Sequence, residues 1–265
     1  MIALTIAGSD PSGGAGVPRD LETFAALGVR GMSVLSCLTA QNSQQVDAVE
    51  TVPAAFVAQQ LQTLLQDSRP AATKTGLLAS VGVVRAVADA IGRLGPLVVD
   101  PVLASTSGTA LVGTGVREAI LTCLLPRAAL VTPNLAEAGA LTETTVADLA
   151  SMRRAAEILL ATGTKAVLVK GGHLDGDPVD LLVTGRGSRE LRAARIDVPA
   201  VRGTGCALSA AIVAGLAQGK GMQDAIDAAR VFLRSALDSA EQVGGGAWHL
   251  GRPGHPGVPP ARPGP

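Results

Sequence analysis

The stretch VGVVRAVADAIGRLGPLVVD, residues 81–100, holds a helix pattern that is followed at once by a strand pattern. In residues 81–95, apolar side chains recur at helical spacing and a glycine marks the end. Residues 96–100 are a short continuous apolar run, which is typical of a strand buried on both faces. A helix that leads directly into a buried strand is the repeating unit of parallel α/β sheets, so this stretch favours that fold class.

The same alternation extends along most of the chain. Strands are predicted over residues 2–8, 32–40, 72–76, 96–100, 129–132 and 165–172, with a hairpin over 179–184 and 190–198. Helices are predicted over residues 18–28, 53–67, 81–95, 113–124, 134–140, 146–161, 206–218 and 222–241. This order predicts a mostly parallel central sheet covered by helices on both faces, a three-layer α/β/α sandwich.

Length and composition predict one domain with a short tail. The chain has 265 residues, 47% of them hydrophobic, which is enough for one large α/β domain, assigned here to residues 1–243. Residues 244–265 are mostly glycine and proline and are predicted to be a tail that is disordered or lies loosely on the surface.

Several classes of protein are disfavoured by charge and cysteine usage. Lysine and arginine number 22, as do aspartate and glutamate, and this balance predicts no nucleic-acid partner. No window approaches the roughly 18–20 apolar residues of a membrane helix, and the first residues do not resemble a secretory signal. Cys37, Cys123 and Cys206 fit neither a disulfide framework nor a zinc site. We therefore expect a cytoplasmic protein with no membrane partner.

Polar and glycine-rich segments follow most of the predicted strands. They are GSDPSGGAG (8–16), TAQNS (39–43), KTG (74–76), DPV (100–102), TPN (132–134) and KGGH (170–173). In open α/β sheets, ligands bind beyond the carboxyl ends of the strands. The segments therefore predict one composite binding site at that edge of the sheet.

The segment GTGCALSAAIVAGLA, residues 203–217, joins a glycine turn to an apolar helix. Gly203 and Gly205 permit a tight backbone and the close approach of another group. The N–H groups at the start of the helix favour an anion, most often a phosphate. A helix start also favours a thiolate at Cys206, which would accept a proton from a substrate hydroxyl. The alternative is a glycine turn with a small buried thiol.

Taken together, these segments resemble the ribokinase superfamily and, within it, the hydroxymethylpyrimidine/phosphomethylpyrimidine kinases of thiamine biosynthesis. The resemblance covers about residues 2–240. It rests on TIAGSDPSGGAG (5–16), TAQN (39–42), KTG (74–76), VVDPV (98–102), VTPNLAEA (131–138), VLVKGGHL (167–174) and GTGCALSAA (203–211), which keep the family's order and spacing. It implies a ribokinase-like fold, ATP and Mg²⁺ as cofactors, and a homodimer. The implied reaction phosphorylates 4-amino-5-hydroxymethyl-2-methylpyrimidine and then its monophosphate.

The resemblance places three residues at the pyrimidine substrate. Gly8 ends the first predicted strand, and Asp20, in the first predicted helix, is implied to contact the ring. Gln41 is implied to recognise the aminopyrimidine by hydrogen bonds, because a carboxamide offers both a donor and an acceptor to a ring nitrogen beside an amine. The alternatives are a solvated helix carboxylate for Asp20 and a loop amide for Gln41.

Further residues are placed at the nucleotide. Lys170, one of four lysines in the chain, is implied to bind phosphate, and Asp100 and Glu137 are implied to reach Mg²⁺, which keeps several waters. The alternatives are a surface lysine for Lys170, a strand-end cap for Asp100 and a helix-surface charge for Glu137. The resemblance also places Thr204 and Asn134, together with Lys170, at the nucleotide, and Asn134 is alternatively a helix cap. The residues implied to act in catalysis are Cys206, Gly203, Gly205 and Lys170. Lys74 is a weaker candidate for phosphate binding. His173 is either a phosphate contact or a loop residue without a role at the site.

Some positions depart from the family's usual residues. They are Pro18 and Arg19 after the glycine loop, Thr106 after the DPV segment, Arg202 before GTGC, and residues 244–247 near the end. Those near the substrate leave two alternatives open. One is a pyridoxal/pyridoxine kinase, which Gln41 disfavours, and the other is a pyrimidine-binding protein without catalysis.

Overall fold

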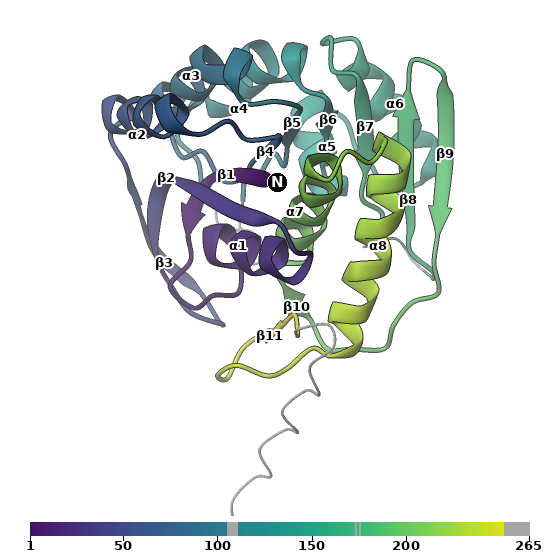
Figure 1. Ribbon diagram of the computed structural model, residues 1–265. Helices are drawn as coiled ribbons and strands as arrows, with labels where there is room; N and C mark the ends of the chain where they lie inside the picture. The colour runs from purple at the N-terminus through teal and green to yellow at the C-terminus, as the bar shows by residue number, and fades with distance from the viewer. Residues whose placement is uncertain (105–110, 173, 175, 252–265) are drawn as a thin grey trace, which may run out of the picture.

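The computed structural model describes residues 1–104, 111–172, 174 and 176–251, and it is built around one large sheet (Figure 1). The strands of this sheet are β1 (Ile2–Ser9), β2 (Arg30–Gln41), β3 (Val46–Thr51), β4 (Ala72–Thr75), β5 (Leu97–Val99), β6 (Leu130–Val131), β7 (Ala166–Val169), β8 (Val179–Thr184) and β9 (Gly187–Arg192). Their spatial order is β3-β2-β1-β4-β5-β6-β7-β8-β9. Strands β2, β1, β4, β5, β6 and β7 run parallel, whereas β3, β8 and β9 pair antiparallel at the two edges.

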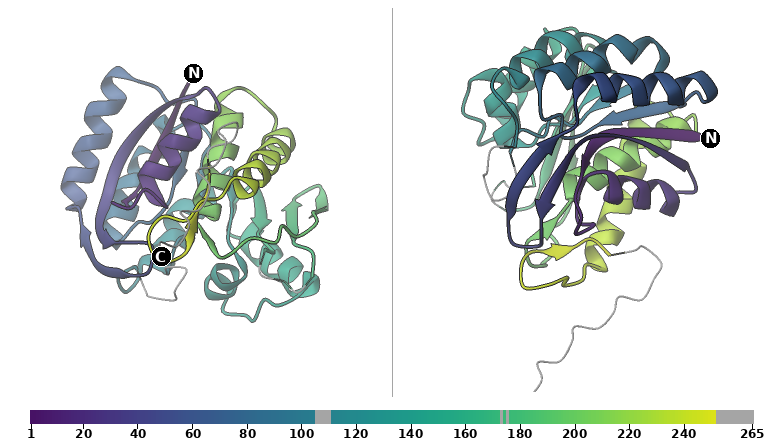
Figure 2. Two further views of the ribbon diagram at one scale, coloured as in Figure 1. Left: turned by 90° about the horizontal axis from the view of Figure 1, so that it is seen from below. Right: turned by 90° about the vertical axis from the view of Figure 1, so that its left-hand side faces the viewer.

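Helices cover both faces of this sheet. They are α1 (Gly16–Ala26), α2 (Ala54–Asp67), α3 (Val81–Ala90), α4 (Val116–Ala119), α5 (Leu135–Thr142), α6 (Leu149–Leu160), α7 (Thr204–Ala217) and α8 (Met222–Asp238). The right-hand view of Figure 2 shows the strands between two helical layers. One layer packs through residues such as Leu61, Val87 and Met152, and the other through Phe24 and Ile212. The predicted three-layer, mostly parallel architecture is confirmed.

The central strands are short and buried. Strands β5, β6 and β7 are wholly apolar, as the continuous runs in the sequence predict, whereas β4 carries the polar residues Thr73, Lys74 and Thr75. All four residues of β7 are buried, and so are those of β4. Burying Val, Leu and Ala on both faces is favourable at about 25 cal/mol per Å² of apolar surface. The carboxyl ends of these parallel strands meet at one edge, where each predicted polar segment begins.

Strand β3 was not predicted from the sequence. Its residues, Val46–Thr51, are half-buried or exposed, and Asp47 and Glu50 interrupt any apolar run. Pairing with β2, not burial, holds this strand in place, with Cys37 opposite Thr51 and Gln41 opposite Val46. The β2–β3 hairpin therefore extends beyond the hydrophobic core, toward the edge that carries the polar segments.

The prediction that a disordered tail begins at residue 244 is wrong for residues 244–251. Trp248–His249 forms strand β11, which pairs in parallel with β10 (Val201–Arg202). Leu250 is 2% exposed and packs against Ala207 and Ala236. The apolar side chains within the glycine-rich run supply the burial that composition alone did not suggest. Residues 252–265 lie outside the described part of the chain.

We predict that Leu250→Ala lowers the free energy of unfolding by about 2–4 kcal/mol, because it removes a buried side chain and leaves a cavity. Urea titration followed by circular dichroism measures this change. Val243→Ala is the matched control, since Val243 is 40% exposed and should cost under about 0.5 kcal/mol. Equal effects of the two substitutions would contradict the packing of this segment.

Candidate active site

A cavity of about 1880 Å³ opens at the carboxyl ends of the parallel strands. It exceeds the roughly 300–1,000 Å³ of a typical site for one small ligand, so two ligands fit side by side. The structure brings nearly all the predicted site residues to its wall: Gly8, Gln41, Asp100, Asn134, Glu137, Lys170, Gly203, Thr204, Gly205 and Cys206. Asp20 is the exception, and Lys74 lines the wall in addition.

The first turn of α7 faces this cavity as predicted. Gly203, the residue before the helix, has φ +74°, and a side chain there would overlap the carbonyl oxygen of Gly14. A Cβ at Gly205 would lie 3.0 Å from the Nζ of Lys170. Glycine is therefore required at position 203, whereas a side chain at 205 would only displace the end of Lys170. No side chain caps this helix start among the described residues. The N–H groups of the turn point to a binding site for an anion.

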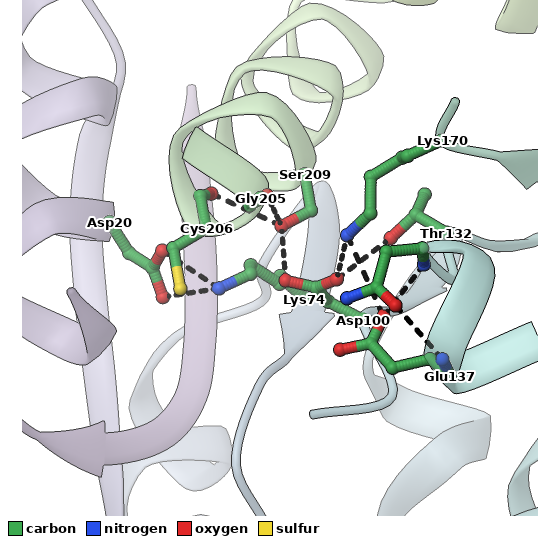
Figure 3. A network of polar contacts seen from close by, with 10 residues as sticks. Asp20, Lys74, Asp100, Thr132, Glu137, Lys170, Gly205, Cys206 and Ser209 are labelled. Carbon is green, nitrogen blue, oxygen red and sulfur yellow. Dashed lines mark hydrogen bonds and ion pairs between the residues drawn. The ribbon is translucent and has the colours of Figure 1, made fainter. Parts of the chain in front are cut away.

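Lys170 and Asp100 form the centre of a polar cluster beside this turn (Figure 3). The Nζ of Lys170 lies 2.9 Å from Oδ1 of Asp100 and 3.9 Å from Oε2 of Glu137. Asp100 also accepts hydrogen bonds from Thr132 at 3.2 Å and from Ser209, in α7, at 3.1 Å. The cluster thus links the ends of β5, β6 and β7 to the second turn of α7.

The charges of this cluster are set by the balance of burial and pairing. Burial disfavours the ionised form of Asp100, but Lys170 and Lys74 outweigh it and hold the pKa of Asp100 below its usual range. Burial raises the pKa of Glu137 to about 7, and Lys170 only partly opposes the rise. Burial lowers the pKa of Lys170, yet Asp100 and Glu137 more than restore it, so this lysine stays protonated.

Asn134 and Glu137 cap the helix that carries them. The Asn134 side chain accepts from the Glu137 N–H at 2.9 Å, and the Glu137 carboxylate accepts from the Asn134 N–H at 2.8 Å. This capping box stabilises the start of α5. Part of each side chain still lines the cavity, so capping and ligand contact are compatible.

The ring contact expected for Asp20 does not fit its place in the structure. Asp20 is fully buried, does not line the cavity, and binds Lys74, whose Nζ lies 2.8 Å from both carboxylate oxygens. Thr5 donates to the same carboxylate at 2.6 Å. Burial disfavours the charge of Lys74, but the Asp20 carboxylate outweighs it and raises the pKa of Lys74. Asp20 thus acts on the site through Lys74.

The surroundings of Cys206 oppose the thiolate expected there. Cys206 lies in the first turn of α7, beside the Asp20–Lys74 pair (Figure 3). Burial raises the pKa of the Cys206 thiol, and Lys74 and a hydrogen bond from the Gly16 backbone only partly offset the rise. The sequence argument counted the helix start but not the burial, which depends on packing against the glycine loop.

Gly8, near the end of β1, lines the cavity as well. A Cβ at Gly8 would approach the Sγ of Cys37 to 2.7 Å, so glycine is required where β1 passes β2. Sequence reasoning gave Lys74 only a secondary role, as a weaker phosphate candidate, and missed Ser209. The scarcity of lysine was a signal for Lys74, whereas a serine within an apolar helix offered little. His173 and Thr106 lie outside the described residues.

The fold and these residues can be compared with known proteins. The sequence profile described as phosphomethylpyrimidine kinase matches residues 10–251. The chain is 46% identical to a hydroxymethylpyrimidine/phosphomethylpyrimidine kinase of Rhizobium meliloti over 245 residues, 91% of this chain and 92% of the relative. An enzyme of the same name from Streptomyces coelicolor is 43% identical over 257 residues, 94% of this chain and 96% of that one.

The chain belongs to the phosphomethylpyrimidine kinase family. The resemblance seen in the sequence is thereby confirmed, together with kinase activity as the chemistry of the family. A solved phosphomethylpyrimidine kinase from Clostridium difficile superposes with a TM-score of 0.79 at 36% identity, covering 89% of this chain and 99% of that one. A pyridoxal kinase from Bacillus subtilis, solved with ADP, gives 0.88 at 32% identity, covering 95% and 97%.

In the described part of the chain, no helix has the length and apolarity needed to cross a membrane. Nor do the described residues place three or more His, Cys, Asp or Glu side chains together as a ready-made metal site.

We predict that Lys74→Met lowers the free energy of unfolding by about 3–5 kcal/mol, because it leaves the Asp20 charge buried and unpaired. The double variant Asp20→Asn/Lys74→Met should regain most of the loss. Arg189→Met is the control, since its pair with Asp227 is 2.9 Å long but 47% and 43% exposed, and should cost under about 1 kcal/mol. Denaturant unfolding measures all three, and a double variant as unstable as Lys74→Met contradicts the prediction.

We also predict a pH-dependent stability that depends on Glu137. Its folded pKa, about 7, lies above the ordinary 4.5, so the folded state holds the proton more tightly. The resulting stabilisation is complete below about pH 4.5 and is lost as the pH rises through about 7. Between about pH 5 and 8, unfolding free energy of the metal-free wild type should fall by about 2–3 kcal/mol more than that of Glu137→Gln. Parallel pH curves for the two proteins would exclude this.

Proposed function

We propose that this cavity transfers the γ-phosphoryl group of ATP to the hydroxymethyl group of 4-amino-5-hydroxymethyl-2-methylpyrimidine and then phosphorylates the monophosphate, for thiamine biosynthesis. The observation that carries the proposal is the first turn of α7, which is uncapped and flanked by the ammonium groups of Lys170 and Lys74. Phosphoryl transfer depends mainly on positioning and on stabilising the charge of the transferred group. A helix start with two cations nearby supplies both.

The cavity offers separate regions for the two substrates. On one side of α7 lie Gly8 and Gln41, which we assign to the pyrimidine. On the other side, the segment before β10 and helix α8 contribute an aliphatic wall that includes Ile196, Val198 and Leu237. We assign this wall to the nucleotide base, with Asn134, Lys170 and Thr204 at the phosphates.

Asp100 and Glu137 fit a magnesium ion in number and kind. Mg²⁺ takes one or two protein carboxylates and completes its shell with waters and substrate phosphates. These two carboxylates share Lys170 as a neighbour and both line the cavity. When bound there with the nucleotide, Mg²⁺ neutralises phosphate charge. A cation held there would favour the ionised form of Glu137.

Cys206 has a more limited role than that of a strong base. Its raised pKa keeps the sulfur protonated at rest, so we assign it to orienting the acceptor hydroxyl at the start of α7. Gly203 and Gly205 keep the backbone of this turn close enough to hold the developing charge.

We also propose, from the family, a homodimer located in the cytoplasm. Size-exclusion chromatography tests the oligomeric state, and cell fractionation tests the location.

A pyridoxal/pyridoxine kinase is the second candidate, favoured by the likeness to the Bacillus subtilis pyridoxal kinase. Gln41 at the cavity wall supports the pyrimidine instead. The test is ADP release with hydroxymethylpyrimidine, its monophosphate, pyridoxine and a thiazole alcohol. We expect turnover with the first two. Turnover with pyridoxine alone would reverse the assignment, and calorimetric binding without ADP release would indicate a binding protein.

We predict that Cys206→Ala lowers kcat for the pyrimidine alcohol about 100-fold through lost positioning, while the Kd for ADP changes less than about twofold. Steady-state kinetics and calorimetry measure the two quantities. Cys123→Ala is the control, because Cys123 is half-buried and does not line the cavity. Unchanged kcat in Cys206→Ala would remove this residue from the reaction.

A further inference from the structure

Asp10 is a buried carboxylate whose hydrogen bonds join three segments at the pyrimidine end of the cavity. It follows β1 and is 3% exposed. Its Oδ1 accepts from the backbone N–H and the hydroxyl of Ser12, at 2.9 and 2.7 Å. Its Oδ2 accepts from Nε2 of Gln41 at 3.3 Å and from Arg202 at 3.4 Å. A carboxylate accepts about four hydrogen bonds, so this one has little capacity left for a ligand.

This contact decides which way the Gln41 amide faces. The oxygen and nitrogen of an amide are nearly alike in shape, and hydrogen bonding decides between the two orientations. An ionised carboxylate only accepts, so it requires Nε2 to face Asp10. The reversed amide would place Oε1 against a negative charge. On its other side, Oε1 of Gln41 lies 3.0 Å from the Thr39 hydroxyl, which can donate to it or to the carbonyl oxygen of Ser9 at 3.1 Å. Because a hydroxyl can also accept, the Asp10 contact alone decides the orientation.

Arg202 holds this arrangement together from a third segment. Besides its contact with Asp10, its guanidinium donates to the carbonyl oxygen of Asn42, the residue after Gln41. Its side chain is 12% exposed, and it directly precedes Gly203 at the start of α7. The residue that departs from the family pattern therefore ties the tip of the β2–β3 hairpin to the proposed transfer site.

We propose that Asp10 is a positioning residue that fixes the amide orientation of Gln41, and that Arg202 supports it. The inference rests on the proposed function, in which Gln41 contacts the substrate ring. With Nε2 fixed toward Asp10, one N–H of Gln41 and one lone pair of Oε1 remain for the ligand. They match an acceptor nitrogen beside an exocyclic amine. In a ring with a hydroxyl beside a methyl group, as in pyridoxine, the hydroxyl takes the place of the amine and the methyl takes the place of the acceptor nitrogen. The methyl group offers the N–H no hydrogen bond, which is costly when that N–H is buried.

The test is a double-mutant cycle on the Kd of hydroxymethylpyrimidine, measured by calorimetry without nucleotide. Asp10→Asn keeps the shape of the side chain but presents either a donor or an acceptor to Gln41, so the amide is free to reverse. We expect a Kd about 10-fold higher in the wild-type background. In the Gln41→Ala background, the same change should alter Kd less than about twofold, because no amide remains to be oriented.

Two further variants keep the test decisive. Arg202→Gln should raise Kd about threefold, again only when Gln41 is present. If thermal unfolding shows that Asp10→Asn does not fold, Arg202→Gln takes its place in the double-mutant cycle. Asp47→Asn is the matched control on the same hairpin, since Asp47 is exposed and outside the cavity, and should leave Kd unchanged.

Two outcomes overturn the inference: an unchanged Kd in both Asp10→Asn and Arg202→Gln, or equal losses with and without Gln41, which would indicate a general structural role. A wild-type protein that neither binds nor phosphorylates the pyrimidine would instead refute the proposed function. The wild-type measurement therefore separates the two failures.

Discussion

Two lysines, one fully buried and one half-buried, lie at the same edge of the sheet, and their pairing with carboxylates is the constraint on which the site depends. Lys74 binds Asp20, and Lys170 binds Asp100 with Glu137 nearby. An ammonium group in such a place is tolerated only when an opposite charge is close. Each lysine is therefore held at a fixed point on the wall, and α7 begins between them (Figure 3).

This arrangement favours a ligand that brings negative charge together with its own counter-ion. The lysines are already paired, so the cluster is not an open basic patch that attracts any anion. A nucleotide with its metal ion adds both signs of charge at once, which fits carboxylates and ammonium groups that lie side by side. Glu137, with its pKa of about 7, is the member most ready to change its charge as the ligand arrives.

The fold could be predicted because burial on both faces of a strand leaves a direct trace in the sequence. The continuous apolar runs before Asp100 and Lys170 predicted both the strands and the edge of the sheet at which the site lies.

Features set by packing in three dimensions left no such trace in the sequence. Asp20 has the same local context as a solvated helix residue, and only the position of Lys74 across the sheet shows its burial. Cys206 was likewise judged by its helix, whereas the glycine loop that buries it is distant in the sequence. Strand β3 and residues 244–251 are held by partners that composition does not reveal.

The contact between Ser43 and Gly246 spans 203 positions of the chain. Ala247 adds a second hydrogen bond to the same residue, and both Gly246 and Ala247 line the cavity. The cavity rim near Gln41 is therefore closed by a segment that is synthesised after all the strands of the large sheet and the helices that cover it. During synthesis, the sheet and most helices have the residues they need well before this rim does, so a nascent chain acquires its architecture before it acquires a complete substrate pocket.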